Sequence, residues 1–443
     1  MMEQLYLGIA RSIITPKIGS QLYGYRPDLF STSVADDLTA TALYFRQADR
    51  QALMMSITVC EIHNDLIATL LDSIERELGI PRNCCQLHAT HTHSGPNTLG
   101  SFGWGDIDQE YCDTIFIPKV LSAARAAVKD PQPVRVGTAC GDSFVGINRD
   151  ELKSDNKIIL GQNPWGCFDP KMTVISFQKE DGTIAANIIH YAAHGTCAGA
   201  CTEISRDWSG VMTDALEKKT GGITAFFNGP EGDIGPRLPS GNTAGRGNMQ
   251  YVYEMGHLAA RDALEIYRKI YDYHDVTLTA GGGVIRIPLQ SRPTEAFARQ
   301  ELEKYKDQTV NWDGHLRNYY ERVLADWENG VPEAADYTIS QTVIGFGSLV
   351  FASFPYELYS QIGMRLNNAF NAEILSLSLT NGDETYFVPE DAICRGYYAV
   401  SLFQTRRTQP PYDNADWYLL RSSIENITAV TGIPERIRPY QWG

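Results

Sequence analysis

Segments with the pattern of β-strands alternate with segments with the pattern of α-helices along the whole sequence. Residues 39–45 (TATALYF) and 52–59 (ALMMSITV) are apolar enough to be buried strands, and residues 64–78 place leucine and isoleucine at helical spacing before a Gly-Ile-Pro stop. This alternation predicts a mixed α/β (α+β) fold with two or more β-sheets flanked by helices. Because no linker or internal repeat interrupts it, we expect residues 1–443 to form one large domain.

The remaining segments extend this prediction. Residues 337–356 are uncharged and long enough to cross a membrane, but their polar residues and glycines indicate two buried strands joined by a turn. The heavily charged residues 293–329 are typical of one long surface helix. The other expected helices are 111–129 and 248–271, and the other expected strands are 84–90, 172–177, 185–191, 223–227 and 373–379.

The chain is acidic, with 38 Lys and Arg against 53 Asp and Glu and a net charge of −15. Nucleic acids and anionic membranes are therefore not expected partners, because both attract basic surfaces. The first residues lack the basic and apolar parts of a secretory signal, and nine cysteines, an odd number, suit reduced thiols. We expect a cytoplasmic protein that acts on a small molecule. The oligomeric state, a homo-oligomer included, stays open.

Two histidines occur in the sequence THTHSGP (residues 90–96), directly after an apolar strand. In an extended backbone, His91 and His93 would share one face and lie roughly 6 to 7 Å apart. Both could then bind one metal ion, or one could bind it while the other accepts a proton from water. The alternative is that one of them is only a polar residue at a strand end.

His194 also follows an apolar strand, and it precedes a glycine, which permits close approach of the backbone to a ligand. Cys197 and Cys201 could be soft metal ligands, but a structural role is the better interpretation because no second thiolate pair accompanies them. His190, four residues earlier, is better explained as a core residue.

The loop NGPEGDIGP, residues 228–236, follows the strand expected at 223–227. Its glycines and prolines predict a tight loop whose backbone faces a cavity, although an ordinary turn would also explain them. The loop lacks the Lys and Ser/Thr of a phosphate-binding loop. Within it, Asn228, Asp233 and Gly235 are the expected substrate contacts.

Taken in order with other motifs, these segments resemble a known family. GIARSIITPKIG, GYRP, THTHSGP, GINR, HGT, SRDWSG, NGPEGDIGP and FPYE follow one another as in the catalytic domain of neutral/alkaline non-lysosomal ceramidases, from residue 5 to about residue 400. The resemblance implies one catalytic zinc ion and hydrolysis of an N-acyl amide bond. It implies His91, His194, Glu357 and Tyr386 as metal ligands, with Phe387 as the alternative to Tyr386, His93 as the catalytic base, and Arg149 and Tyr398 as transition-state stabilisers.

Departures from that family bear on the substrate. Gly235 stands where many ceramidases have a serine, and Tyr356 replaces the glycine before the metal-binding glutamate. The chain ends at residue 443, without the immunoglobulin-like domain that membrane-acting ceramidases add. We therefore expect a small, soluble, polar amide in place of ceramide. Polar residues that follow the motifs support this expectation, namely Asp106, Asp108, Gln109 and Arg237.

Alternatives stay open at this point. The same zinc site would serve an esterase or a lactonase, because an alcohol leaving group needs less protonation than an amine. A true ceramidase and a non-catalytic binding protein agree less well with the sequence. Trp104, Trp165 and Phe168 could line the pocket or pack in the core.

Overall fold

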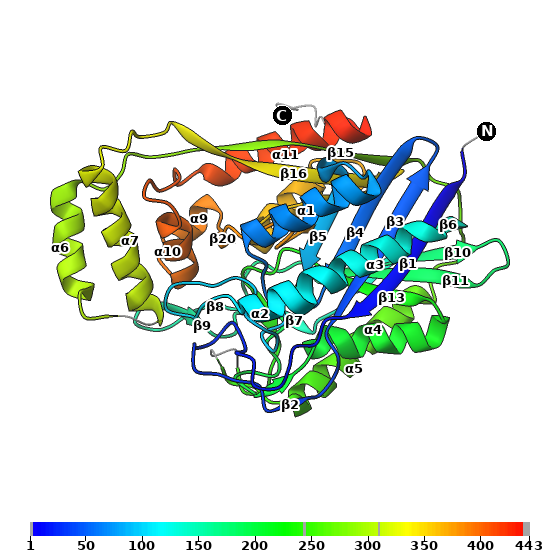
Figure 1. Cartoon of the computed structure of the whole chain (residues 1–443), viewed down its shortest axis with the longest axis horizontal. Helices are drawn as coiled ribbons and strands as arrows, with labels where there is room; N and C mark the ends of the chain where they lie inside the picture. The colour runs from blue at the N-terminus through cyan, green and yellow to red at the C-terminus, as the bar shows by residue number, and fades with distance from the viewer. Residues whose placement is uncertain (1–2, 242–244, 309–310, 437–443) are drawn as a thin grey trace, which may run out of the picture.

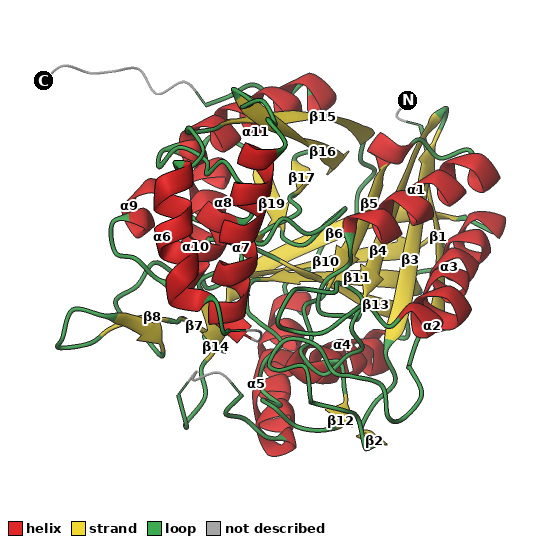
Figure 2. Ribbon diagram, turned by 60° about the vertical axis from the view of Figure 1, so that its left-hand side comes forward, coloured by secondary structure: helices red, strands yellow, loops and turns green. Residues whose placement is uncertain are grey.

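Two β-sheets pack face to face, and helices cover the outer face of each (Figures 1 and 2). The computed structural model describes residues 3–241, 245–308 and 311–436. Both sheets contribute apolar side chains to the core between them, where the rings of Phe45 and Phe346 lie 4.7 Å apart. The arrangement confirms the predicted mixed α/β fold with several sheets. The single domain of residues 1–443 stays a prediction.

The larger sheet has eight strands. Its neighbouring strands are antiparallel except β4 with β5 and β11 with β13, which are parallel. Parallel neighbours need a crossover connection, and α1 (Asn64–Leu78) and α4 (Asp207–Thr220) supply it. The strand order is β13 (Ile223–Asn228), β11 (Ile184–Tyr191), β10 (Lys171–Lys179), β6 (Gln132–Asp142), β1 (Leu5–Ile13), β3 (Thr39–Gln47), β4 (Arg50–Ile57) and β5 (Cys85–Ala89).

This sheet curls, so that its two edges meet. Nε2 of His88 in β5 accepts a hydrogen bond from the backbone N–H of Asn228 in β13, at 2.8 Å. Beyond the strands, Thr92 forms an isolated β-bridge with Gly195. The segments that follow β5 and β11 are therefore neighbours, although they are far apart in the sequence and the two strands are far apart in the sheet order.

The outer face of the larger sheet is covered by α1, α4 and two further helices, α3 and α5, whose bounds follow. Helix α1 spans the predicted residues and ends at Gly79, whose φ of 69° suits glycine. The predicted helix 111–129 is a short turn, Gln109–Tyr111 (α2), and a π-helical segment, Cys112–Phe116, that lead into α3 (Ile117–Lys129). Helix α5 (Met249–Tyr267) lies within the predicted 248–271.

The smaller sheet contains β15 (Leu278–Pro288), β16 (Asp336–Phe346), β17 (Leu349–Ser353) and β19 (Glu373–Leu377), in that order. Its β16–β17 hairpin confirms the two strands predicted in the uncharged stretch, and Gly347 makes the turn with a φ of 64°. The helices that pack on this sheet are α8 (Ser360–Asn368), α10 (Tyr398–Thr405) and α11 (Ala415–Thr431).

The single helix predicted over residues 293–329 is wrong. The structure has two helices there, α6 (Glu295–Tyr305) and α7 (Asn311–Glu328), which lie side by side at one end of the molecule (Figure 1). They share a small apolar core that contains Ala298 and Val323. Packing the two halves against each other buries apolar surface that one isolated helix would leave in water.

The remaining strands and helices of the described residues are short. Within the described residues, no helix combines the length and the apolar character needed to cross a membrane. The short strands are β2 (Ser33–Val34), β7 (Gly146–Asn148), β8 (Asp150–Leu152), β9 (Ile158–Leu160), β12 (Glu203–Ile204), β14 (Ile234–Pro236), β18 (Glu357–Leu358) and β20 (Tyr386–Phe387), and the short helices are η1 (Arg82–Cys84) and α9 (Glu390–Ile393).

Candidate metal centre

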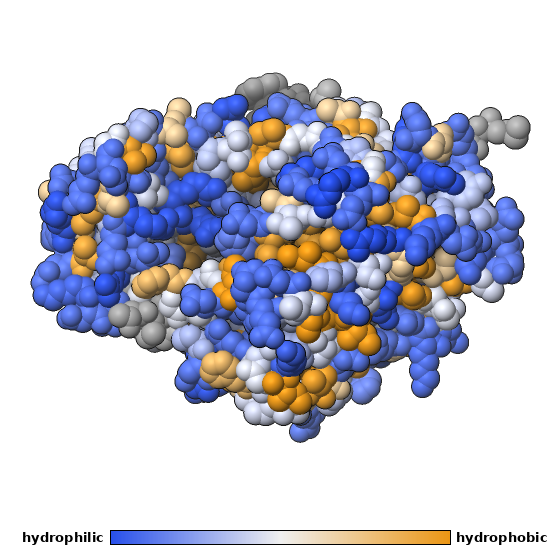
Figure 3. All heavy atoms as spheres, in the orientation of Figure 1, coloured by the Kyte–Doolittle hydropathy of each residue, from blue (hydrophilic) through white to orange (hydrophobic). Residues whose placement is uncertain are grey.

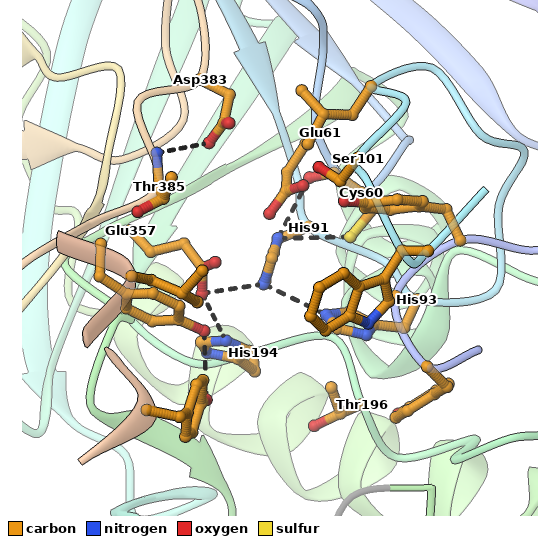
Figure 4. Close-up of a pocket in the computed structure, with 18 of the residues that line it drawn as sticks. Cys60, Glu61, His91, His93, Ser101, His194, Thr196, Glu357, Asp383 and Thr385 are labelled. Atoms are coloured by element: carbon orange, nitrogen blue, oxygen red, sulfur yellow. Dashed lines mark hydrogen bonds and ion pairs between the residues drawn. The ribbon is translucent and has the colours of Figure 1, made fainter. Parts of the chain in front are cut away.

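Three potential metal ligands from distant parts of the sequence converge at one point (Figure 4). Oε2 of Glu357 lies 2.9 Å from Nε2 of His194 and 3.4 Å from Nε2 of His91. All three side chains are buried. His91 follows β5, His194 follows β11, and Glu357 begins β18, so the curl of the larger sheet and its packing on the smaller one bring the three together. The group could hold a metal ion.

Backbone carbonyl groups fix the tautomer of both imidazoles. Nδ1 of His91 lies 3.1 Å from the carbonyl oxygen of Cys60, and Nδ1 of His194 lies 2.9 Å from that of Glu231. A carbonyl oxygen only accepts hydrogen bonds, so each Nδ1 carries a proton and, in a neutral imidazole, each Nε2 presents a lone pair to Glu357. Lone pairs this close to a carboxylate need a proton or a metal ion among them, and the donor set therefore fits a metal ion.

The pKa values follow from burial and from the neighbouring charges. Burial would raise the pKa of Glu357, but His91 and His194 hold it well below its usual range. Burial, Arg149 and His91 together lower the pKa of His194 to about 3. Burial and His91 likewise lower the pKa of His93 well below its usual range. His194 and His93 are thus neutral near pH 7, the state in which imidazole can bind a metal ion or accept a proton.

The extended backbone predicted at the two neighbouring histidines is wrong. His91 has a left-handed backbone with a φ of 67°, and the rings of His91 and His93 pack edge to face with centroids 4.8 Å apart. Glycines allow this crowding. A Cβ atom on Gly195 would lie 2.7 Å from the carbonyl oxygen of His91, and one on Gly232 would lie 2.5 Å from that of Glu357.

His93 stands beside the convergent group. Its Nε2 is 3.2 Å from Nε2 of His91, and its Nδ1 is buried against Gly24 with no hydrogen-bond partner among the described residues. Tyr25 packs on the ring, with centroids 5.0 Å apart. Cys60, His91 and His93 form a second group whose spacing could hold a metal ion, so a role for His93 as a ligand is geometrically open.

Tyr386 lies next to the glutamate of the group. The strands β18 and β20 pair in parallel, with Glu357 opposite Tyr386. The ring of Phe387 instead packs on Tyr356, with centroids 4.9 Å apart, inside an apolar core. The tyrosine, and not Phe387, therefore lines the cavity.

Arg149 and Tyr398 complete the predicted set. Nη2 of Arg149 donates to the Tyr386 hydroxyl at 2.8 Å and lies 3.9 Å from Oε2 of Glu357. The hydroxyl groups of Tyr386 and Tyr398 are 3.2 Å apart. A buried guanidinium and two phenols are thus grouped on one side of the convergent ligands, where they can donate hydrogen bonds to a substrate oxygen.

The ligand group opens into a cavity of about 690 Å³, a size typical of small-molecule sites. Of the three predicted substrate contacts, only Gly235 lines it. The Asn228 side chain bonds to the backbone of Ala193, and the Asp233 carboxylate accepts hydrogen bonds from Ser360. Asn228 and Asp233 therefore lie behind the cavity wall and hold its loops in place, which corrects their predicted contact with substrate.

The aromatic and polar residues noted near the motifs have different positions. Trp104 lines the cavity, Trp165 is exposed, and Phe168 packs near Phe144. His190 is buried and its Nε2 donates to a backbone carbonyl, as expected of a core residue. The cavity wall does not include the four polar residues that supported a polar substrate, Asp106, Asp108, Gln109 and Arg237.

Several residues of the cavity wall were not predicted. Glu61 follows the apolar strand β4 just as His91 follows β5, and this strand-end position is a signal that could have identified it. Arg322 comes from α7, a helix predicted to be an ordinary surface element. The others include Cys60, Asp383 and Arg406.

No family model matches the chain. The neutral ceramidase of Pseudomonas aeruginosa is 26% identical over 242 residues, which are 49% of this chain and 35% of the relative. The match therefore spans about a third of the relative's length.

Solved structures extend the likeness in fold. The crystal structure of neutral ceramidase from Pseudomonas aeruginosa superimposes with a TM-score of 0.74 at 16% identity, over 99% of this chain and 77% of that one. A ceramidase complexed with C2 gives a TM-score of 0.73 at 17% identity over the same shares. The chain is therefore similar to neutral ceramidase, in sequence over about half of its length and in fold over nearly all of it.

Proposed function

We propose that this protein is a zinc-dependent hydrolase that cleaves the amide bond of an N-acyl compound with water. The observation that carries the proposal is the convergence of His91, His194 and Glu357 at a cavity, with the neutral His93 beside them. Zinc bound by nitrogen and oxygen ligands supplies a Lewis acid and lowers the pKa of water to about 7. The sequence relationship to neutral ceramidase supports an amide as the bond that is cleaved.

Each neighbouring residue then has a chemical task. His93 takes a proton from water at Nε2, the atom that faces the ligand group, and returns it to the leaving amine. Arg149 and Tyr398 donate hydrogen bonds to the carbonyl oxygen as it becomes negative. Tyr386, opposite Glu357, is the fourth ligand in this proposal. Both imidazole ligands keep their orientation through their Nδ1–carbonyl hydrogen bonds.

The substrate in this proposal is a small polar amide, and the protein acts in the cytoplasm on neither a nucleic acid nor a membrane. Polar side chains on the cavity wall, such as Ser101 and Asn318, support a polar substrate, and the nine cysteines, all free, support a reducing compartment. Ceramide is the second candidate, because the sequence match is to a neutral ceramidase. An ester or lactone would use the same groups.

Metal analysis and a substrate panel test the proposal together. The purified protein should contain about one zinc ion, and a chelator should abolish activity until zinc is restored. N-acyl amides, esters, lactones and ceramide should be assayed at matched concentration. Faster turnover of ceramide than of every soluble amide would make the second candidate correct. Metal-free protein with full activity would contradict the zinc mechanism.

A further inference from the structure

The wall of the cavity has a charge opposite to that of the whole chain. Five arginines and three carboxylate residues line it, whereas acidic residues outnumber basic ones by 53 to 38 in the sequence. One arginine, Arg149, and one carboxylate, Glu357, belong to the proposed catalytic group. Outside the catalytic group, the arginines therefore still outnumber the carboxylates. These remaining arginines are Arg26, Arg246, Arg322 and Arg406.

Arg322 is a positively charged group held in place by neutral partners. His315, Asn318 and Arg322 follow one another at helical spacing, so one face of α7 lines the cavity. Nη1 of Arg322 donates to the carbonyl of Arg406 at 3.2 Å, and Nη2 donates to that of Thr405 at 3.0 Å. In the described part of the chain no carboxylate lies within ion-pair distance of Arg322, and its Nε is buried without a partner.

Arg406 stands next to it with its charge only partly balanced. Its Nη2 donates to the carbonyl of Asp383 at 3.0 Å, and its Nε lies 3.6 Å from Glu384. Glu384 is bound more closely by Arg407, at 2.7 Å, so one carboxylate serves two guanidinium groups. The side chain of Arg406 is 36% exposed. Burial and the nearby Arg406 lower the pKa of Arg322, as expected where a buried positive charge lies close to another.

Helix α7, which carries Arg322, and the end of α10, which Arg406 directly follows, form the outer end of the site. In Figures 1 and 2 α7 lies next to α10, and Figure 3 shows mostly hydrophilic residues over the end formed by α6 and α7. Apolar side chains line the cavity elsewhere, among them Leu99, Phe102 and Trp104. The cavity thus offers an apolar surface to hydrocarbon and a positively charged pair to an oxyanion.

We infer that the substrate carries an anionic group, a carboxylate, phosphate or sulfate, and that Arg322 and Arg406 bind this group while the amide lies at the ligand group. The inference rests on the proposed amide hydrolysis. Guanidinium groups suit oxyanions because they donate two parallel charge-assisted hydrogen bonds. Carbonyl partners that already fix Arg322 reduce the entropy lost when the anion binds.

Matched substrates test the inference. N-acyl amino acids should be compared with their methyl esters and primary amides, which share the acyl chain but lack the negative charge, and phosphate and sulfate analogues should form separate arms. The anionic member should have a kcat/KM about 10 to 100 times higher, the range of one charged hydrogen bond. In Arg322→Gln this preference should disappear through a higher KM, with the neutral substrate unaffected. Equal turnover of anionic and neutral members by the unchanged protein would overturn the inference.

Arg317→Gln is the matched control. Arg317 is also on α7, but it pairs with Glu321 and does not line the cavity, so the preference should persist. A binding measurement separates this inference from the proposed function. Phosphate, sulfate or succinate, compared with chloride at equal ionic strength, should raise the Tm of the unchanged protein and of Arg317→Gln more than they raise the Tm of Arg322→Gln.

The kinetic and the Tm measurements together distinguish a wrong anion site from a wrong proposed function. Anion-dependent stabilisation without any amide hydrolysis would contradict the proposed function and support the anion site. Hydrolysis without charge preference and without anion-dependent stabilisation would support the function and overturn the site. A fall in kcat/KM of Arg322→Gln that is equal for charged and neutral substrates would also overturn it, because it would indicate a structural effect.

Discussion

Nε2 of His91 and Nε2 of His93 are 3.2 Å apart, and the two rings meet edge to face. The Nδ1 atom of His91 donates to the Cys60 carbonyl, and although burial opposes the shift, the nearby Glu357 raises the pKa of this imidazole. Either a proton on one of the two imidazoles or a metal ion must therefore lie at this short contact. The relationship places His93 where it can exchange a proton beside the proposed metal ion without being one of its three convergent ligands.

His93→Ala should keep the metal ion and lose about two to four orders of magnitude in turnover, the usual effect of removing a general base. His194→Ala should lose both metal and activity, because its Nε2 contacts Glu357 directly. Metal content by elemental analysis and single-turnover rates check both variants. If His93→Ala empties the site while His194→Ala does not, the ion is held by the alternative group of Cys60, His91 and His93.

The two cavity tyrosines should differ in their effects. Tyr386 is opposite Glu357 across paired strands, so Tyr386→Phe should weaken metal affinity about tenfold or more. The Tyr398 hydroxyl lies 3.2 Å from the Tyr386 hydroxyl and is not one of the convergent ligands, so Tyr398→Phe should leave metal affinity unchanged and lower kcat. Competition with a chelator measures the affinity. Equal affinities in the two variants would remove Tyr386 from the ligand set.

Gly232→Ala should damage the metal centre without changing any ligand. Its new Cβ would lie 2.5 Å from the carbonyl oxygen of Glu357, a backbone atom that cannot move alone. We expect a loss of about 1 to 3 kcal/mol in the free energy of unfolding, together with weaker metal binding. Gly95→Ala is the control, since its Cβ would meet neighbours at an ordinary 3.5 Å. Equal stability of the two variants would show that the chain relaxes around Gly232.

Asp233 should make stability depend on pH. Burial and the neighbouring Asp150 raise its pKa from 3.8 to about 7 in the folded protein. Between these values the unfolded chain has released the proton that the folded protein still holds, so this residue's contribution to stability falls as pH rises from about 4 to about 7. In metal-free protein, the stability lost in Asp233→Asn should therefore be larger at pH 5 than at pH 8, measured by urea unfolding. A loss in the free energy of unfolding that is the same at both pH values would refute the raised pKa of Asp233.

The fold and the functional role of His91 and His194 could be predicted because both depend on local patterns, whereas Glu357 was expected only from the family resemblance. Apolar strands and amphipathic helices have clear periodicities, and His91 and His194 each follow such a strand. The left-handed backbone of His91 could not be predicted, because it depends on Gly195 packing against its carbonyl from a distant segment. Here a tertiary contact overrides the extended conformation that the local sequence favours.

Other errors also arose from contacts between distant segments. Asn228 and Asp233 have the residue types of substrate contacts, but they bond to Ala193 and Ser360, whose positions only the fold determines. The charged segment that contains Arg322 has the composition of a solvated helix. Its role in the cavity depends on folding back beside α10, which no local periodicity indicates.

The ligand group has its imidazoles on one sheet and its carboxylate beside the other. A metal ion bound there would therefore connect the two sheets. His91 and His194 extend from the larger sheet, whereas Glu357 follows the last residues of β17. The binding energy of a metal ion at this group would therefore also hold the two sheets together. Substitutions in the distant core between the sheets, such as Phe346→Ala, should lower metal affinity. Metal affinity would then be a measure of how well the two sheets pack against each other.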